Sequence, residues 1–240
     1  PRQIISYLEN FFKQKDYLKK KNIRAVVTTG PTREYIDPVR YISNESSGKQ
    51  GYEIALELSR LGIQTTLISG PTNINYSKEI KVKKIISGKQ MFNEIKKTLP
   101  TDIAVCASAV SDFKPVVKNK QKLKKKINLN KIQLEQNPDI LEFLGKNNKY
   151  KPKLLIGFSA ETENILENSI EKMHEKRCDI IVANDVSKKE TGFNVDLNEV
   201  MIINKNGKIQ KIKKSSKKFI AMMVAKKIIT SFLDINKRLN

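Results

Sequence analysis

The sequence holds few of the residues that mark several large classes of protein. Its 240 residues include no tryptophan, one histidine and two cysteines. Because Cys106 and Cys178 lie far apart in apolar runs, neither a disulfide framework nor a zinc site is indicated. We expect two reduced, buried thiols and a cytosolic, that is cytoplasmic, location. No stretch reaches the roughly 18 apolar residues of a membrane span, and the first residues lack the apolar core of a secretory signal.

Positive charge is abundant: 46 lysine and arginine residues against 25 aspartate and glutamate residues give a formal net charge of +21. Such an excess is typical of proteins that bind nucleic acid. Aromatic residues are only 7% of the chain, however, and they do not alternate with the basic residues as a base-stacking platform would. Lysine, asparagine and isoleucine are all frequent, which is the composition that an AT-rich genome imposes. We therefore expect no nucleic-acid partner, and a subset of lysines that serve an anionic small molecule.

Apolar runs alternate with amphipathic stretches along most of the chain, and they predict the following elements. Strands are predicted over 23–29, 63–69, 82–87, 102–110, 154–160 and 178–185, and helices over 3–19, 49–61, 88–98, 161–177 and 215–236. Another helix is predicted to open with Asn137 as its N-cap and Pro138 as its first residue. The Asn206-Gly207 pair within 199–212 predicts a β-hairpin.

This order predicts an α/β fold, a three-layer, Rossmann-like, doubly wound and mostly parallel sheet with a β-hairpin added late. One domain over 23–240 follows an N-terminal helical segment over 1–22. In such sheets, ligands bind beyond the carboxyl ends of the strands. The loop SNESSGKQG places Ser46, Ser47 and Gly48 at a helix start, which is a phosphate-binding arrangement, although an ordinary capped loop has the same composition. It matches neither the Walker motif nor the dinucleotide fingerprint.

Lysines form two further groups that could bind an anion. Lys122, Lys124, Lys125 and Lys126 lie in the lysine-rich segment 111–134, which we interpret as a flap able to close over a polyphosphate; a solvated charge run is the alternative. Lys172 and Lys176 are four positions apart, so they share one helical face. The single histidine, His174, lies on another face and is interpreted as a surface residue.

The motifs taken together closely resemble those of bacterial phosphopantothenoylcysteine synthetase. The resemblance begins near residue 23 and continues in order to the C-terminal part of the chain. Its segments are GPTREYIDPVRYISNESSGKQG, LISGPT, ASAVSDFKP, KLKK, NPDIL, GFSAET, the Lys172 and Lys176 pair, ANDVS and GFNVDLNEV. The family more often has AAAVADY and GFAAET where this chain has ASAVSDF and GFSAET, which are small departures.

The resemblance implies a ligase of coenzyme A biosynthesis that joins 4′-phosphopantothenate to L-cysteine. It implies an acyl-CMP intermediate formed from CTP with Mg²⁺, and release of pyrophosphate and CMP. The NPDIL and KLKK segments favour CTP over the ATP of eukaryotic relatives. The resemblance leaves the Mg²⁺ ligands unknown.

Residue roles follow from the matching motif positions. The resemblance implies catalytic roles for Asn44, toward the acyl intermediate, for Lys122, in the first half-reaction, and for Arg40. The nucleotide-binding residues that it implies are Ser108, Asp112, Lys122, Pro138, Asp139, Ile140, Leu141, Phe158, Lys172 and Lys176.

Fused relatives carry a segment like PRQIISYLENFF between a flavin-dependent decarboxylase and the synthetase. We therefore expect the chain to be an excised synthetase domain that contains no flavin. The resemblance also implies a homodimer, in which the late hairpin is a candidate contact. Two rival classes make different predictions. A nucleic-acid adaptor would bind DNA or RNA in a salt-sensitive way. An NAD(P)-dependent oxidoreductase would need a glycine fingerprint that the sequence lacks.

Overall fold

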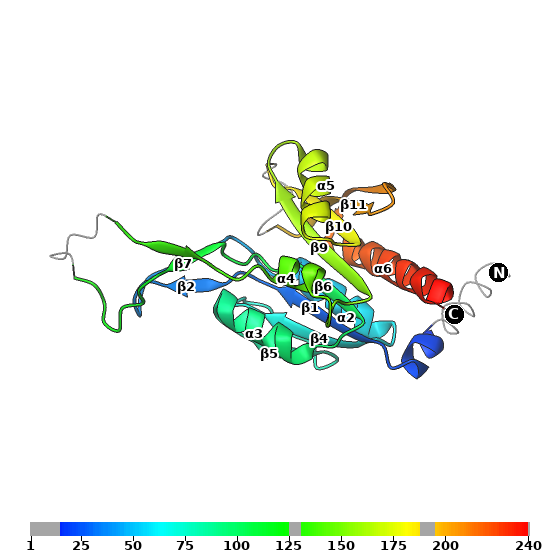
Figure 1. Ribbon diagram of the computed structural model, residues 1–240, viewed down its shortest axis with the longest axis horizontal. Coiled ribbons are helices and arrows are strands. Elements are labelled where there is room, and N and C mark those ends of the chain that lie inside the picture. Colours follow the sequence, from blue (N-terminus) through cyan, green and yellow to red (C-terminus); the bar gives the residue numbers. More distant parts are fainter. Residues whose placement is uncertain (1–14, 125–130, 188–194, 240) are drawn as a thin grey trace.

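The computed structural model describes residues 15–124, 131–187 and 195–239 (Figure 1). Most of the helix predicted over 3–19 lies outside these ranges, and residues 15–20 are helical. Lys125 and Lys126 of the predicted flap also lie outside them.

An eight-stranded sheet forms the centre of the molecule, in the order β12-β11-β10-β9-β6-β1-β4-β5. The six strands from β10 to β5 are parallel, and the β11–β12 hairpin adds two antiparallel strands at one edge. The strand bounds are β1 Arg24–Thr29, β4 Gln64–Ser69, β5 Lys81–Lys84, β6 Ile103–Cys106, β9 Leu154–Glu161, β10 Ile180–Asp185, β11 Leu197–Asn204 and β12 Ile209–Ser216. The predicted mostly parallel, doubly wound sheet with a late hairpin is confirmed.

Helices cover both faces of the sheet, which gives the three layers. Their bounds are α2 Lys49–Arg60, α3 Gly88–Thr98, α4 Ile140–Lys146, α5 Ile165–Glu175 and α6 Lys217–Leu239. Alternate strand residues point to opposite faces. Val27 therefore packs with α2 and α6, whereas its neighbour Val26 packs with α3, α4 and α5. Burial on both faces explains why the parallel strands are nearly continuous apolar runs.

Four element boundaries differ from those predicted. The strand predicted over 102–110 ends at Cys106, because Ser108 turns out of the sheet, where its hydroxyl donates to Thr28 Oγ1 at 2.9 Å. The helix predicted to be capped by Asn137 begins at Ile140 instead. Its N-cap is Asp139, whose carboxylate accepts from the Glu142 N–H at 2.8 Å.

The Asn137 amide has another partner, since it donates to the carbonyl of Ser111 at 2.8 Å. The helix predicted over 161–177 begins only at Ile165, because strand β9 continues to Glu161. The third predicted strand, 82–87, is the edge strand β5 and ends at Lys84.

Two short antiparallel ribbons project from the carboxyl end of the sheet, at the left of Figure 1. One pairs β2 (Arg33–Tyr35) with β3 (Tyr41–Ser43), and the other pairs β7 (Phe113–Pro115) with β8 (Leu134–Gln136). We call residues 33–43 and 113–136 together the extension, of which 125–130 are outside the described residues. Its strands were not predicted, because three-residue strands with polar side chains carry no apolar period.

Candidate functional site

Two adjoining cavities lie beyond the carboxyl ends of the central strands, where an open α/β sheet binds its ligands. Their volumes are about 440 Å³ and about 570 Å³. The lining residues common to both are Ser108, Val110, Asp112, Phe158 and Lys172. The cavities therefore form one continuous site, and we refer to them as the small and the large cavity.

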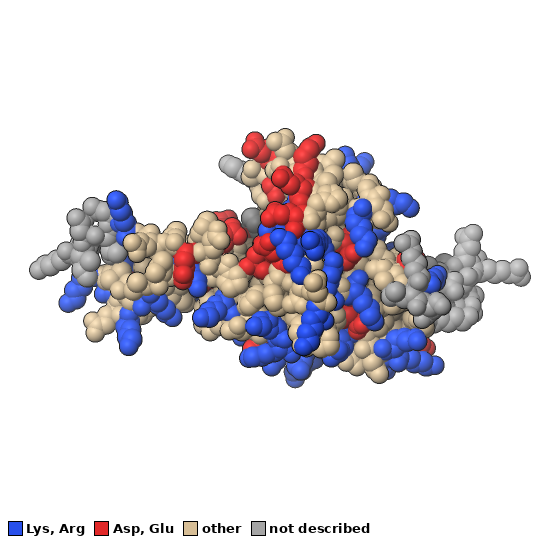
Figure 2. Space-filling view, viewed as in Figure 1, with Lys and Arg blue, Asp and Glu red and all other residues tan. Residues whose placement is uncertain are grey.

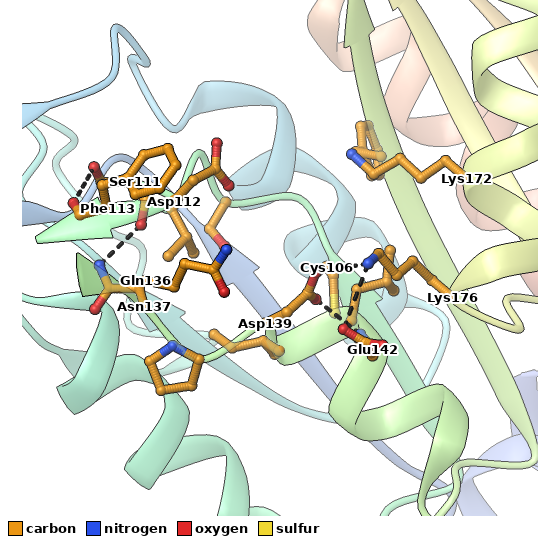
Figure 3. Close-up of a pocket in the computed structure, with 16 residues that line it drawn as sticks. Cys106, Ser111, Asp112, Phe113, Gln136, Asn137, Asp139, Glu142, Lys172 and Lys176 are labelled. Carbon is orange, nitrogen blue, oxygen red and sulfur yellow. Dashed lines mark hydrogen bonds and ion pairs between the residues drawn. The ribbon is translucent and has the colours of Figure 1, made fainter. Parts of the chain in front are cut away.

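The small cavity gathers residues from β6, β9, α4, α5 and the base of the extension (Figure 3). Of the predicted nucleotide-binding residues, it is lined by Ser108, Asp112, Pro138, Asp139, Ile140, Leu141, Phe158, Lys172 and Lys176. The structure thus brings together all of that set except Lys122. Their assignment as binding residues stays a prediction.

The two lysines of α5 differ in their surroundings, although both face the small cavity (Figure 3). The Lys176 ammonium lies 2.8 Å from Glu175, 3.3 Å from Asp139 and 3.5 Å from Glu142. The Glu175 hydrogen bond, together with Asp139 and Glu142, raises the pKa of Lys176 above its usual range. Lys172 makes no ion pair within the described part of the chain, so its charge is available to a ligand.

Of the two cysteines predicted to be buried, Cys178 is buried and Cys106 is partly exposed. Both are free, and burial raises the pKa of Cys178 to about 12. Burial likewise raises the pKa of Cys106 far above its ordinary value, although Cys106 lines the small cavity. Thiolate is the reactive form, so neither cysteine is suited to nucleophilic chemistry near neutral pH.

The large cavity is lined by the SNESSGKQG loop and by the first turn of α2. The N-cap Gly48 has a left-handed backbone with φ of 73° and makes no side-chain cap, and the Ser47 hydroxyl accepts from the Lys49 N–H at 3.5 Å. The Thr29 hydroxyl donates to the Gly48 carbonyl at 2.6 Å and fixes the loop to the end of β1. A side chain at Gly51 would lie 2.5 Å from Thr29 Oγ1, so this glycine lets the helix approach the strand closely. The helix start therefore presents its positive end to the cavity, as the sequence predicted.

The predicted phosphate-loop residues Ser46, Ser47 and Gly48 all line the large cavity. Lys49 also lines the large cavity, but its ammonium is paired with Asp196 at 2.5 Å. That hydrogen bond lowers the pKa of the Asp196 carboxyl.

The three predicted catalytic residues lie apart from one another. Asn44 lines the large cavity, and its amide donates to the Val110 carbonyl at 3.0 Å. Arg40 lies on the extension, where it pairs with the buried Asp37 at 2.5 Å and donates to the Leu123 carbonyl at 3.0 Å. Neither Arg40 nor Lys122 lines either cavity. In the described residues of this single chain, only Asn44 of the three reaches the site.

The large cavity is also lined by polar residues that were not among the predicted site residues, including Gln50, Asn184, Asn198 and Lys217. Asn184 ends strand β10, and Lys217 begins helix α6 directly after β12. Strand β12 runs in the same direction as β10, because each is antiparallel to β11. Its carboxyl end therefore reaches the same edge of the sheet, which only the strand order reveals. The ANDVS motif was a signal for Asn184, but nothing local marks Lys217.

His174 is exposed on α5, as predicted.

Among residues 15–124, 131–187 and 195–239, no group of three or more potential ligands is arranged to hold a metal ion. Within the same ranges, none of the helices has both the length and the apolar character needed to cross a bilayer.

The fold and the two cavities at the carboxyl ends of the strands, which we call the rim, define a class: a Rossmann-like α/β protein with a polar cleft suited to an anionic small molecule. Residues 20–232 match the family described as the DNA/pantothenate metabolism flavoprotein C-terminal domain, and the chain belongs to this family. It is 40% identical over 227 residues to the coenzyme A biosynthesis bifunctional protein CoaBC of Borreliella burgdorferi, with 93% of this chain covered. It is 37% identical over 233 residues to the protein of that name in Haemophilus influenzae, with 97% of this chain covered.

The chain spans little more than half of these relatives, 56% and 57% of their lengths. Among solved structures, the C-terminal domain of a CoaBC protein superimposes with a TM-score of 0.74 at 34% identity. That match covers 88% of this chain and 96% of the other. These two relatives are thus named as bifunctional proteins of coenzyme A biosynthesis.

These findings contradict the specific assignment drawn from the motifs. The matching family is described as a flavoprotein domain, not as a CTP-dependent synthetase. The ligase reaction, CTP as co-substrate and Mg²⁺ are therefore withdrawn. The expectation of a protein without flavin is also corrected, since the family description names a flavoprotein.

The residues present do not fit a complete flavin site. Serine, lysine, acidic and amide side chains dominate both cavities, and Phe113 and Phe158 are the aromatic side chains among the residues lining them. The described part of the chain thus offers at most part of the contacts that a flavin ring needs. The longer relatives contain much that this chain does not span.

Proposed function

We propose that this chain binds 4′-phosphopantothenoylcysteine in the two rim cavities, as part of a protein of coenzyme A biosynthesis. The family relationship supports a pantothenate-derived molecule. Such a molecule carries a phosphate at one end and a cysteinyl carboxylate at the other. To receive them, the large cavity offers the start of α2, and the small cavity offers Lys172 beside its carboxylates. Cavities of about 570 and 440 Å³ are within the usual range for a ligand of this size.

The observation that carries the proposal is the start of α2, where the N-cap Gly48 makes no side-chain cap and the helix opens on the large cavity beside Ser46 and Ser47. Free N–H groups and the helix dipole at such a position favour a phosphate. Lys172 lies at the boundary with the small cavity and, among the described residues, forms no ion pair with the carboxylates of Asp112, Asp139 and Glu142 that also line it. We assign the phosphate to the helix start and the cysteinyl carboxylate to Lys172.

The reaction is assigned to the longer type of protein that the relatives represent. A flavoprotein of this pathway consumes phosphopantothenoylcysteine by decarboxylation, in which CO₂ leaves the cysteinyl α-carbon and a proton takes its place. A flavin, when bound, supplies the electron-transfer chemistry for that step. The residues of this chain bind and orient the molecule. The cytoplasmic location and the homodimer stay predictions.

Calorimetry with the chain tests the binding proposal. We expect 4′-phosphopantothenoylcysteine to bind, and the same molecule without its phosphate to bind at least tenfold more weakly, since charge-assisted hydrogen bonds are strong. The Lys97→Gln variant is the matched control, because Lys97 is an exposed lysine paired with Glu94 far from the rim. Equal affinity for the two molecules, or no binding of either, would overturn the proposal.

A further inference from the structure

Two buried acceptors in the large cavity lack hydrogen-bond partners. In the described residues, Gln50 Oε1 and Asn184 Oδ1 are buried without any partner, and both residues line this cavity. Buried polar atoms are nearly always hydrogen-bonded, because leaving one unpaired is costly. Two such atoms in one cavity point to a ligand that supplies the missing donors.

The orientation of the Gln50 amide is fixed by its surroundings. Its Nε2 donates to the main-chain carbonyl of Lys217 at 3.2 Å. The reverse orientation would place two acceptors against each other, so Oε1 is the atom that remains unpaired. Since Gln50 lies in the first turn of α2, this acceptor is close to the proposed phosphate position.

A buried cation lies beside these acceptors. Lys217 is 6% exposed and lines the same cavity. Burial and the nearby Lys49 ammonium lower its pKa, and Asp196 acts in the opposite direction. The lining of one cavity thus combines acceptors for O–H or N–H groups with a cation for an anionic group.

We propose that Gln50 and Asn184 accept a hydrogen bond from a hydroxyl or amide N–H that lies next to the ligand's phosphate, while Lys217 contacts that phosphate. This inference rests on the proposed function and adds a specificity site to it. The matching ligand class is a phosphate monoester with a donor group two or three carbons away. In phosphopantothenoylcysteine, the secondary hydroxyl beside the phosphate-bearing carbon chain fits this description.

Calorimetry with three ligands tests the inference: 4′-phosphopantothenoylcysteine, its analogue without the secondary hydroxyl, and its analogue without the phosphate. We expect the wild type to lose roughly tenfold or more in affinity when the hydroxyl is removed, since an unpaired site rejects such analogues. In Gln50→Met, the affinities with and without the hydroxyl should agree within about twofold, and the preference for phosphate should persist. In Lys217→Met, the phosphate preference should fall and the hydroxyl preference should persist.

Two further variants keep the test decisive. Gln64→Met changes an exposed glutamine at the far end of the sheet and should match the wild type. Asn184→Leu removes the other acceptor, so it should reduce the hydroxyl preference even if Gln50→Met folds poorly. Full hydroxyl discrimination in folded Gln50→Met would overturn the inference.

The affinities of the wild type for the three ligands distinguish a failure of the specificity site from a failure of the proposed function. If it prefers the phosphorylated ligand but ignores the hydroxyl, the specificity site is wrong and the proposed function stands. If it binds none of the ligands, the proposed function fails and the specificity site falls with it.

Discussion

At the scale of single residues, the cations of the rim are not equivalent. Lys49 and Lys176 are already paired with carboxylates, whereas Lys172 has no ion pair among the described residues. Lys217 is buried beside the first turn of α2. A cation that is already neutralised gains less from an anionic ligand, so Lys172 should contribute more to binding than Lys176.

Exchange of each α5 lysine for glutamine should separate binding from stability. Lys172→Gln should weaken the binding of 4′-phosphopantothenoylcysteine about tenfold and leave the melting temperature nearly unchanged, because no ion pair is lost. Lys176→Gln should lower the free energy of unfolding by about 1 kcal/mol and the melting temperature by roughly 2–4 °C, because it breaks contacts to three partly exposed carboxylates.

Calorimetry and thermal unfolding of both variants check this pair of expectations. Lys97→Gln serves as control for both measurements. A larger loss of affinity in Lys176→Gln than in Lys172→Gln would contradict the assignment of the ligand's carboxylate to Lys172.

At the scale of elements, the extension is held by one buried carboxylate. Asp37 accepts from the main-chain N–H groups of Val39, Arg40 and Leu123 and from the Arg40 guanidinium. It therefore ties the turn between β2 and β3 to the chain near Lys122. The Arg40 hydrogen bond holds the pKa of Asp37 well below its usual range.

This carboxylate predicts a pH dependence with a definite sign. Because the folded pKa lies below the ordinary value of about 3.9, the stabilisation is complete above that value and is lost as the pH falls through the lower folded pKa. In Asp37→Asn, the amide protons near Val39 and Leu123 should lose protection at all pH values. In the wild type, their protection should hold from pH 7 to pH 5 and decline only in stronger acid.

Hydrogen exchange, corrected for intrinsic rates, measures both expectations. Asp234→Asn, an exposed substitution on α6, is the control and should leave the extension unchanged. Equal protection in the wild type and Asp37→Asn would show that another contact holds the extension.

The elements that sequence could predict are those with an apolar period. Helix α3 matches its predicted bounds because Ser87 and Gln90 form a capping box at its start. The hairpin turn at Asn206-Gly207 is confirmed because Gly207 takes a left-handed backbone with φ of 76°. The predicted start of α4 was wrong because Asn137 and Asp139 are both good N-cap residues. The Asn137 amide instead donates to the Ser111 carbonyl, which leaves Asp139 to cap the helix.

The site was predictable only in part, for a similar reason. Asn44 and Phe158 lie in recognisable motifs near strand ends, and Lys172 is four positions from Lys176 on a predicted helix, so the sequence alone could select them as site residues. Gln50 and Lys217 meet through a bond between segments far apart in the chain. That meeting depends on the order of the strands, which the local pattern does not contain.

At the scale of the whole molecule, the positive charge is distributed rather than concentrated. On the face in Figure 2, lysine and arginine side chains occur over many elements, and acidic side chains gather near its centre. Exposed apolar side chains, in contrast, concentrate on the extension. They are Val39, Phe113, Val116, Val117, Ile132 and Leu134, each between 44% and 64% exposed.

The extension, rather than the late hairpin, should therefore be the contact of the expected homodimer. Contiguous exposed apolar side chains on a projecting ribbon are typical of interaction surfaces. We expect light scattering after size exclusion to give a dimer for the wild type. The double substitution Val116→Asp and Val117→Asp should shift it to the monomer at the same concentration, because charges would be buried in the contact. Ile209→Asp, which places a charge on an exposed hairpin position, should leave the dimer intact. A wild type that stays monomeric at all concentrations, or dissociation caused by Ile209→Asp alone, would contradict this view of the extension.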